Sequence, residues 1–383
     1  MGMKRREFLR KGTVGAAGAA TLGAAACGPG EEPAGTSAGA VAGPRINWRL
    51  ATSFPQSLDI IHGSGLQIAD IVSDLTGGRF TIRVYAAGEI VPGLQVMDAV
   101  QQGTVHCGVT AGYYYIGKNP ALAFDATVPF GLGTRQQISW LYHGGGLDAL
   151  NSVYADFGLL TFPAVSTGCQ MGGWFREPVS TLRDLNGLRM RIPGIGGEIM
   201  ARLGVTVQTL AGGDIYPALE RGAIDATEWI GPYDDEKLGF HAIAQNYYYP
   251  GWWEPGLTGS LLVSREAWDA LPPAYRSVLR TACAQTLSQR LAQYDHANPL
   301  ALQRLVRDHG VVLREYSEDI LQAAFRESNA YLEEQAADNE SFRTVYASWK
   351  EYRDAAYPYF AGNELSFARF AYPRVGRSDM TAG

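Results

Sequence analysis

The sequence predicts an α/β protein with mostly parallel sheets. The prediction rests on short segments in which apolar and polar residues alternate, on helical periodicity between them, and on a helix–glycine–strand pattern that occurs twice. Residues 46–51 alternate as a strand does, and residues 80–86 do so again. Residues 59–75 have helical periodicity and end at a glycine pair. Strands that alternate with helical segments are typical of parallel sheets, because parallel neighbours need a crossover connection.

The repeated pattern links two distant parts of the chain. Residues 99–108 and residues 218–227 both have the pattern of a helix end, a glycine cap and a short buried strand. One interpretation is that any α/β protein repeats this pattern by chance. The other is that the chain forms two similar lobes, whose strands end at a shared cleft. Ligands of open α/β sheets collect beyond the carboxyl ends of strands, and Glu228 follows the second copy directly.

The first 26 residues have the composition of an export signal. Residues 4–11 are basic and include a twin arginine, Arg5-Arg6, and an Ala/Gly-rich stretch follows. That stretch is too short and too weakly apolar to span a bilayer stably. We therefore expect a cleaved twin-arginine signal peptide in residues 1–26 and a periplasmic protein; the alternative is a disordered basic arm.

Cys27, which follows the expected signal, is a candidate for lipid attachment. The small residues before it fit a lipoprotein signal, but Ala24 stands where such signals usually carry leucine. Ordinary signal cleavage falls at the same bond, so both interpretations stay open. Residues 27–44 are rich in Gly, Ala and Pro, and we expect a flexible tether there.

The mature chain is acidic. Residues 1–26 contain five basic side chains and one acidic side chain, so their removal takes the formal net charge from -6 to about -10. Such a chain has no electrostatic footprint for nucleic acid. Beyond Cys27 there are three cysteines, with no metal-binding spacing, so we expect core residues rather than a disulfide framework. About 350 residues are too many for one simple core, which again favours two lobes.

The C-terminal third is predicted to be mostly helical. Residues 265–309 are almost unbroken helix by pattern, with Pro272-Pro273 starting one segment and Pro299 expected to kink another. Residues 317–338 and 342–359 are further amphipathic helices.

Arg191 is the first candidate binding residue. Residues 187–194 are strand-like, with Arg189 and Arg191 on one face. A guanidinium at a strand end suits bidentate capture of a carboxylate. The alternative is a surface strand with two solvated arginines.

Glu228, Glu254 and Gln170 are candidate metal ligands. Both glutamates are flanked by tryptophans, so we expect partly buried carboxylates, which need a partner or a proton. A cation meets that need, and Gln170 adds a neutral oxygen. The alternative is that each glutamate pairs with an arginine.

The aromatic candidates are Tyr114, Tyr115, Phe54 and Trp229. The run Tyr113-Tyr114-Tyr115 follows the first copy of the repeat and resembles a wall for a small planar ligand. Three adjacent aromatics are also common in a mixture of core and surface. His-Glu-x-x-His, phosphate-loop and Cys-x-x-Cys motifs are missing, so we expect no enzyme.

Taken together, these segments resemble a known family. The chain is similar to extracytoplasmic solute-binding proteins of TRAP (tripartite ATP-independent periplasmic) transporters, in the branch that binds 2-oxo and 2-hydroxy monocarboxylates with a metal ion. The likeness runs over nearly the whole mature chain. The segments that carry it are residues 87–92, 113–118, 128–132, 170–176, 188–193, 228–229 and 252–255.

The resemblance implies roles for the candidate residues. Arg191 matches the arginine that pairs with the substrate carboxylate. Gln170, Glu228, Glu254 and the main-chain carbonyl of Trp229 match the metal ligands, and the ion, sodium or calcium, touches the substrate as well. The substrate-contacting set implied is Arg191, Gln170, Tyr114, Tyr115, Phe54 and Trp229.

The resemblance also implies an architecture and partners. Two lobes close on the ligand, and a long helix links them. Residues 46–165 and about 253–290 form lobe I; residues 166–252 and about 291–373 form lobe II and the helices of a homodimer. The membrane partner is the TRAP permease. Competing functions are a receptor for a dicarboxylate or a branched 2-oxo acid, a secreted metal-dependent lyase or hydrolase with a glutamate base, and a structural lipoprotein.

Overall fold

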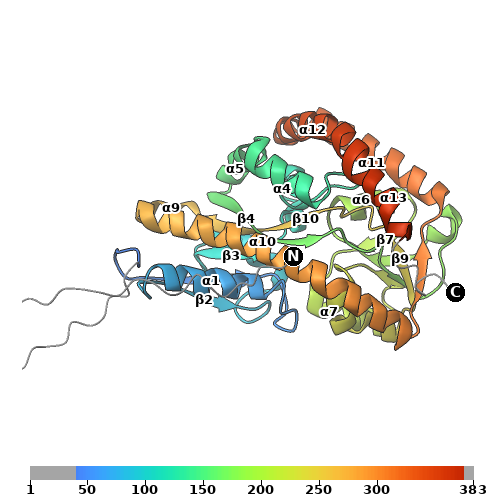
Figure 1. Cartoon of the computed structure of the whole chain (residues 1–383), viewed down its shortest axis with the longest axis horizontal. Coiled ribbons are helices and arrows are strands. Elements are labelled where there is room, and N and C mark those ends of the chain that lie inside the picture. Colours follow the sequence, from blue (N-terminus) through green and yellow to red (C-terminus); the bar gives the residue numbers. More distant parts are fainter. Residues whose placement is uncertain (1–39, 375–383) are drawn as a thin grey trace, which may run out of the picture. The chain divides into compact units, whose positions relative to one another are not determined.

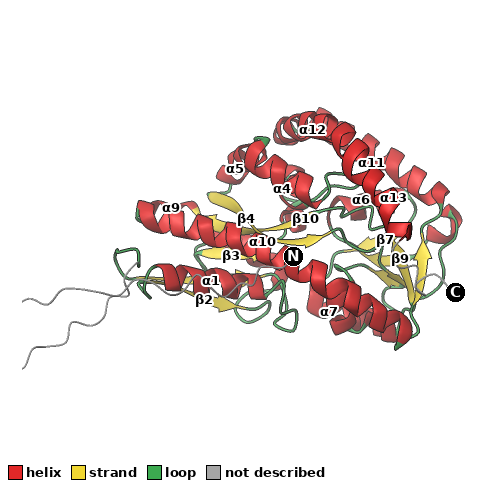
Figure 2. Ribbon diagram, in the orientation of Figure 1, coloured by secondary structure: helices red, strands yellow, loops and turns green. Residues whose placement is uncertain are grey.

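Two β-sheets surrounded by helices make up residues 40–374, the part of the chain that this computed structural model describes (Figures 1 and 2). The predicted signal peptide, Cys27 and most of the predicted tether lie outside the described residues. Among residues 40–374, no helix combines the length and hydropathy that a bilayer crossing requires.

The first sheet has the strand order β2-β1-β3-β10-β4. β1 (Ile46–Thr52) runs parallel to β2 (Phe80–Tyr85) and to β3 (Cys107–Thr110). β10 (Leu257–Ser264) is antiparallel to both β3 and β4 (Leu159–Gly168). Both strands predicted at the start of the chain are thereby confirmed.

The second sheet has the order β11-β9-β5-β8-β6-β7, with one antiparallel strand, β5, between β8 and β9. Its other pairings are parallel, so parallel pairings outnumber antiparallel ones by five to four over the two sheets. The strands are β5 (Trp174–Phe175), β6 (Arg189–Arg191), β7 (Thr206–Gln208), β8 (Ala226–Thr227), β9 (Asn246–Tyr249) and β11 (Val312–Glu315).

The repeated helix–glycine–strand pattern is present in both sheets. α2 (Val96–Gln101) leads to β3, and α7 (Gly212–Glu220) leads to β8. Gly103 and Gly222 after these helices have φ of 72° and 67°, a left-handed conformation that glycine adopts without strain. Each pattern thus delivers a strand to the interior of its sheet, with the strand's carboxyl end at the site described below.

Two chain segments and one long helix connect the sheets. Gln170 after β4 donates its main-chain N–H to Glu254 O before β10 at 3.1 Å, so these connections lie side by side. α10 (Pro273–Arg307, 35 residues) packs against α1 (Gly63–Leu75) and β4 as well as against α8 (Pro232–Leu238). In Figure 1 it runs in orange past the strands of the first sheet and continues toward α7. The long linking helix is confirmed, and it continues through Pro299.

α1 begins at Gly63, four residues after the predicted start at residue 59, because residues 55–62 after β1 form turns that begin at Pro55. The remaining helices between the strands are short. They are α3 (Ala123–Ala126), α4 (Thr134–His143), α5 (Gly146–Ala155), α6 (Gly194–Arg202) and α9 (Arg265–Ala270), with 3₁₀ turns at Gly93–Gln95, Gly112–Tyr115, Pro120–Leu122, Leu182–Leu185 and Phe240–Ala242.

The C-terminal helices pack on the outside of helices that connect the strands of both sheets. α11 (Glu318–Asp338) packs against α6, and α12 (Glu340–Phe360) packs against α4 and α5. A short π-helix, Ala361–Leu365, leads to α13 (Ser366–Ala371) and a last 3₁₀ turn, Tyr372–Arg374. The helices predicted for residues 317–338 and 342–359 are confirmed. The division into two lobes stays a prediction. The sequence assigns the end of the chain to lobe II, but α12 packs on α4 and α5, which belong to the residues predicted for lobe I.

Candidate functional site

Arg191 is the last residue of β6 and is 1 % exposed. β8 lies parallel beside β6 with Thr227 opposite Arg191, so Glu228 follows directly at the same sheet end. The Arg191 guanidinium forms an ion pair with the Glu228 carboxylate, and its Nη1 also donates to Glu228 O at 3.1 Å. Nε donates to Leu210 O at 3.1 Å, while Nη2 has no partner among the described residues. Nε and Nη1 are therefore held by the protein, and Nη2 is available to a ligand.

The two arginines of β6 have different environments. Arg189, on the same strand face, is exposed and pairs with Asp225 at 2.6 Å. The sequence interpretation of two solvated arginines thus holds for Arg189 only. Burial of Arg191 needs a reason, because removing a guanidinium from water is costly.

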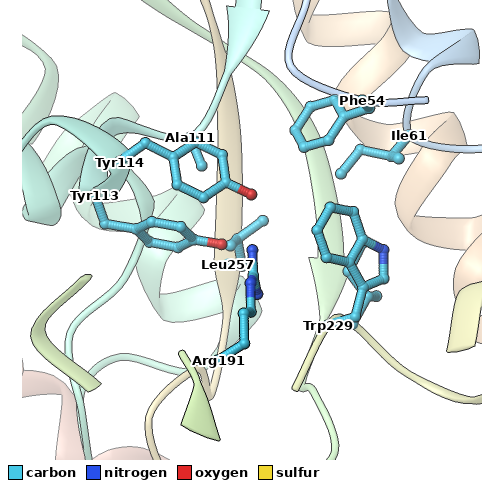
Figure 3. Close-up of a pocket in the computed structure, with 9 residues that line it drawn as sticks. Phe54, Ile61, Ala111, Tyr113, Tyr114, Arg191, Trp229 and Leu257 are labelled. Atoms are coloured by element: carbon cyan, nitrogen blue, oxygen red, sulfur yellow. The ribbon is translucent and has the colours of Figure 1, made fainter. Parts of the chain in front are cut away.

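A cavity lies in front of Arg191. Figure 3 shows the Tyr113 and Tyr114 hydroxyls pointing toward the guanidinium, with Phe54, Ile61 and Trp229 on the other side. The lining comes from the carboxyl ends of β1, β3, β6 and β8 and from the start of β10. The lining residues are Phe54, Ile61, Ala111, Tyr113, Tyr114, Arg191, Trp229, Ile230 and Leu257.

Trp229 joins the charged and aromatic parts of the wall. The Arg191 Cζ lies 5.1 Å from the Trp229 ring centroid, a cation–π contact. Phe54 meets the same ring edge-to-face at 6.4 Å. A Cβ at Gly212, where α7 starts, would lie 2.7 Å from the Trp229 ring, so only glycine leaves room for it.

Three oxygens near Arg191 are buried without a hydrogen-bond partner among the described residues: Gln170 Oε1, Glu228 Oε2 and Glu254 Oε2. All three side chains are at most 3 % exposed. The Gln170 amide nitrogen donates to Thr167 Oγ1 at 3.1 Å, which leaves its oxygen as the free atom. Buried polar atoms are nearly always satisfied, so three orphaned oxygens in one region indicate a missing partner that is positively charged.

The two glutamates disfavour each other's charge. Burial raises the pKa of Glu228 to about 7, with Asp235 adding to the rise and Arg191 opposing it. Burial and the neighbouring Glu228 hold the pKa of Glu254 well above its ordinary range. A cation between these groups would relieve both effects.

The residues fit a hard metal ion. Two carboxylates and one amide oxygen are hard donors. The main-chain oxygens of Glu228 and Ile230 accept hydrogen bonds, whereas that of Trp229 accepts none among the described residues. The Trp229 oxygen is therefore available as a fourth metal ligand. Nowhere in residues 40–374 do three His, Cys, Asp or Glu side chains converge as a metal cluster, which is consistent with a set that includes amide and carbonyl oxygens.

The structure brings most of the predicted residues together. Phe54, Tyr114, Arg191 and Trp229 line the cavity. Of the predicted metal ligands, Glu228 pairs with Arg191, and the main chain of Gln170 hydrogen-bonds to that of Glu254.

Tyr115 is not part of the wall. Its hydroxyl accepts the Met97 N–H at 3.1 Å and lies 2.9 Å from Thr110 Oγ1, inside the first sheet's core. Tyr113 lines the cavity instead, because consecutive side chains of the 3₁₀ turn point in three directions.

Sequence reasoning missed the apolar part of the wall. Ala111 directly follows β3, and Ile230 stands three residues after the end of β8, so the repeat pattern could have found them. Ile61 and Leu257 carry no such signal, because their position depends on how distant segments pack.

Comparisons with known proteins place the chain in a family. Residues 51–339 match the model for "Bacterial extracellular solute-binding protein, family 7" (DctP). A monocarboxylate 2-oxoacid-binding periplasmic protein from Nostoc sp. is 50 % identical over 96 % of this chain and 99 % of its own length.

Two solved structures of TRAP transporter solute-binding proteins are similar. One from Bordetella bronchiseptica, a mixed-occupancy dimer with copurified calcium and picolinate, has a TM-score of 0.86 at 42 % identity and covers 88 % of this chain and 100 % of its own. One from Pseudoalteromonas atlantica, with bound sodium and pyruvate, has a TM-score of 0.83 at 34 % identity and covers 85 % and 99 %. The chain belongs to the DctP family of TRAP transporter solute-binding proteins.

Proposed function

We propose that the protein captures a small 2-oxo or 2-hydroxy monocarboxylate, such as pyruvate or lactate, together with a sodium or calcium ion. The observation that carries this proposal is the set of unpartnered atoms: Arg191 Nη2 at the cavity, and three buried oxygens beside it. The free guanidinium nitrogen suits a carboxylate, and the oxygens suit a cation that also contacts the ligand. The ions and acids described for the similar structures support this pairing.

A monocarboxylate fits the cavity better than a dicarboxylate. Arg191 is the only cationic residue among those that line the cavity. A second carboxylate would meet the apolar side chains of Phe54, Ile61 or Leu257 and would lose its hydration without a partner.

The choice between sodium and calcium depends on charge. Two carboxylates and two neutral oxygens suit either ion, and the higher ionic charge favours calcium modestly. Together with Arg191, the ion would balance the charges of Glu228 and Glu254.

Calorimetry tests the proposal directly. The purified protein is treated exhaustively with chelator in a sodium-free buffer and titrated with pyruvate, first without ions and then with added calcium or sodium. We expect tight binding with an ion, and at least tenfold weaker binding without one. Succinate is the matched control. Equal affinity with and without ions, or tighter binding of succinate than of pyruvate, would overturn the proposal.

The family consists of receptors, so the protein is a periplasmic binding protein and not an enzyme. We infer that the two sheets belong to two lobes that close on the ligand, and that the closed form delivers the ligand to the TRAP permease. The sheet ends that meet at the cavity support this inference. Turnover of a bound 2-oxo acid would instead favour a lyase.

We also propose export by the twin-arginine route, with Cys27 as a candidate lipid anchor. The support is the sequence of residues 4–27 alone. Mass spectrometry of the exported protein separates a lipidated Cys27 from ordinary cleavage, and Arg5→Lys with Arg6→Lys should block export.

A homodimer through the C-terminal helices is the last part of the proposal. Phe367, Phe370 and Tyr372 are 66 %, 63 % and 72 % exposed on the final helical turns. Large aromatics that gather on one exposed segment favour a protein partner. Sedimentation of the protein ending at residue 360 should give a monomer where the full chain gives a dimer.

A further inference from the structure

Asp235 is a fully buried carboxylate that the site described above does not use. It lies in the first turn of α8, is 1 % exposed, and accepts four hydrogen bonds. Oδ1 accepts the main-chain N–H groups of Ile230 and Gly231, both at 3.2 Å. Oδ2 accepts Trp174 Nε1 at 2.9 Å and the Tyr247 hydroxyl at 2.7 Å. Every lone-pair direction of this carboxylate is therefore used inside the protein.

These bonds tie the ligand loop to the second sheet. We define the ligand loop as residues 228–231, which contain Glu228, the Trp229 carbonyl and the cavity residue Ile230. Trp174 lies in β5 and Tyr247 in β9, two neighbouring strands. Asp235 holds the far end of the loop against these strands, while Arg191 holds its near end through the Glu228 carbonyl.

The neighbouring Asp234 offers an internal comparison. It is also fully buried, and its Oδ2 accepts the hydroxyl of a buried tyrosine, Tyr294, at 2.7 Å. Tyr294 belongs to α10, and no hydrogen bond among the described residues connects Asp234 to the ligand loop. The two aspartates are thus alike in burial, helix and tyrosine partner. They differ in that Asp234 Oδ1 has no hydrogen-bond partner among the described residues, and they face different parts of the molecule.

We propose that Asp235 is a positioning residue for the ion: by clamping the Ile230 and Gly231 amides it fixes the direction of the Trp229 carbonyl and of the Glu228 side chain. This inference rests on the proposed function. A carbonyl that must point at an ion depends on the rigidity of its peptide, and outer hydrogen-bond partners of metal ligands typically change metal affinity by about 10- to 100-fold when removed.

The test compares Asp235→Asn with Asp234→Asn. An asparagine at 235 has one acceptor and one donor end, so it must face either the two amides or the Trp174 N–H with a donor. We expect the calcium concentration that half-saturates pyruvate binding to rise by about 10- to 100-fold in Asp235→Asn, and by less than about threefold in Asp234→Asn. The melting temperature in chelator measures the structural cost of each change separately.

Tyr247→Phe and Tyr294→Phe give a milder matched pair, which keeps both carboxylates. Each removes one hydroxyl that donates at 2.7 Å to a buried aspartate. We expect only Tyr247→Phe to weaken ion affinity, by several-fold, even if the two variants lose equal thermal stability. This pair decides the question if Asp235→Asn does not fold.

The outcomes are separable. If the wild-type protein binds pyruvate equally well without an ion, the proposed function fails, and the role of Asp235 fails with it. If the wild type needs the ion but Asp235→Asn and Tyr247→Phe change ion affinity no more than their partners do, Asp235 is only structural and the inference is wrong.

Discussion

The two sheets contribute different chemistry to one cavity. The first sheet supplies apolar and aromatic groups with neutral hydroxyls, from Phe54 and Ile61 after β1 and from Tyr113 and Tyr114 after β3. The second sheet supplies the charge, on Arg191 and Glu228, and fixes it by hydrogen bonds. It also adds the neutral side chains of Trp229 and Ile230 to the lining. The charged half is therefore built before a ligand arrives, whereas the neutral half covers and desolvates the ligand. Electrostatic groups that are held in place lose little entropy on binding.

Buried carboxylates show the same difference. Asp125 in the first half is fully buried and accepts hydroxyl hydrogen bonds at 2.8 to 3.2 Å from Tyr154, Thr161 and Ser260. Glu228 and Glu254 each keep an oxygen without a partner. Burial of an acid is thus no evidence of a site by itself. Several unpartnered oxygens that gather beside a buried guanidinium distinguish the site; within residues 40–374, Asp234 Oδ1 is also unpartnered but stands apart from them.

The largest effect is expected at Arg191. Arg191→Ala removes the carboxylate partner and leaves the buried Glu228 unpaired, so pyruvate affinity should fall by at least about 30-fold, since such truncations cost about 2–5 kcal/mol. Arg189→Ala, on the same strand but exposed, is the control and should stay within about twofold. Calorimetry on both proteins measures the contrast. Similar losses in the two variants would contradict the division between the buried and the solvated arginine.

Glu254→Gln should have the second largest effect. The change keeps the shape and removes one negative charge, so calcium affinity should fall by about 100-fold. The melting temperature in chelator should not fall, because glutamine replaces a carboxyl group whose charged form is disfavoured by burial. Thermal scans with and without calcium check both parts. A variant that loses stability but retains wild-type calcium affinity would show that Glu254 has a structural role only.

Changes in the neutral half should be milder. Tyr114→Phe removes a hydroxyl that points at Arg191 across the cavity. Loss of one hydrogen bond from this hydroxyl to the bound ligand, about 1 kcal/mol, corresponds to roughly fivefold weaker pyruvate binding. Tyr115→Phe is the control, because the Tyr115 hydroxyl bonds to Met97 and Thr110 instead. Calorimetry should detect a loss only in the first variant. The opposite ranking would restore Tyr115 to the site.

The smallest effect on ligand binding is expected for Asp125→Asn. At this residue the measured quantity is the free energy of unfolding. Burial raises the pKa of Asp125 to about 6. Below about pH 4 the folded and unfolded forms are both protonated. Between about pH 4 and pH 6 only the unfolded form releases the proton. As the pH rises through this range, the free energy of unfolding therefore falls by about 1.4 kcal/mol per pH unit, about 3 kcal/mol in all.

The comparison is with Asp125→Asn, which lacks this loss. Urea unfolding of both proteins at pH 4 and pH 7 should show the wild type losing about 3 kcal/mol more than the variant. Pyruvate affinity should stay within about twofold. An equal pH dependence in the two proteins would mean that Asp125 is ionised in the folded state from pH 4 upward.

The sequence predicted the charged half better than the neutral half. Arg191 and Glu228 stand at strand ends, and strand ends can be located from alternation and from the repeated glycine pattern. The environment of Arg191 was harder to predict, because Arg189 has the same strand context and differs only in what packs over it.

The neutral half depends on local helical phase and on distant packing. The choice between Tyr113 and Tyr115 depends on the 3₁₀ geometry of four residues, which the tyrosine run does not reveal. Ile61 reaches the cavity through a turn segment where the sequence predicts helix. Asp235 gives no signal in the sequence, since its role comes from partners on two strands, one 61 residues before it and one 12 residues after it.

The position of β10 has a consequence for how the chain is made. It fills the gap between β3 and β4, but it is synthesised only after every strand of the second sheet except β11. A nascent chain that ends before residue 257 therefore carries two unpaired strand edges in its first sheet. Such edges invite pairing with other chains. The half-made protein thus depends on protection from aggregation until about two-thirds of its residues have left the ribosome.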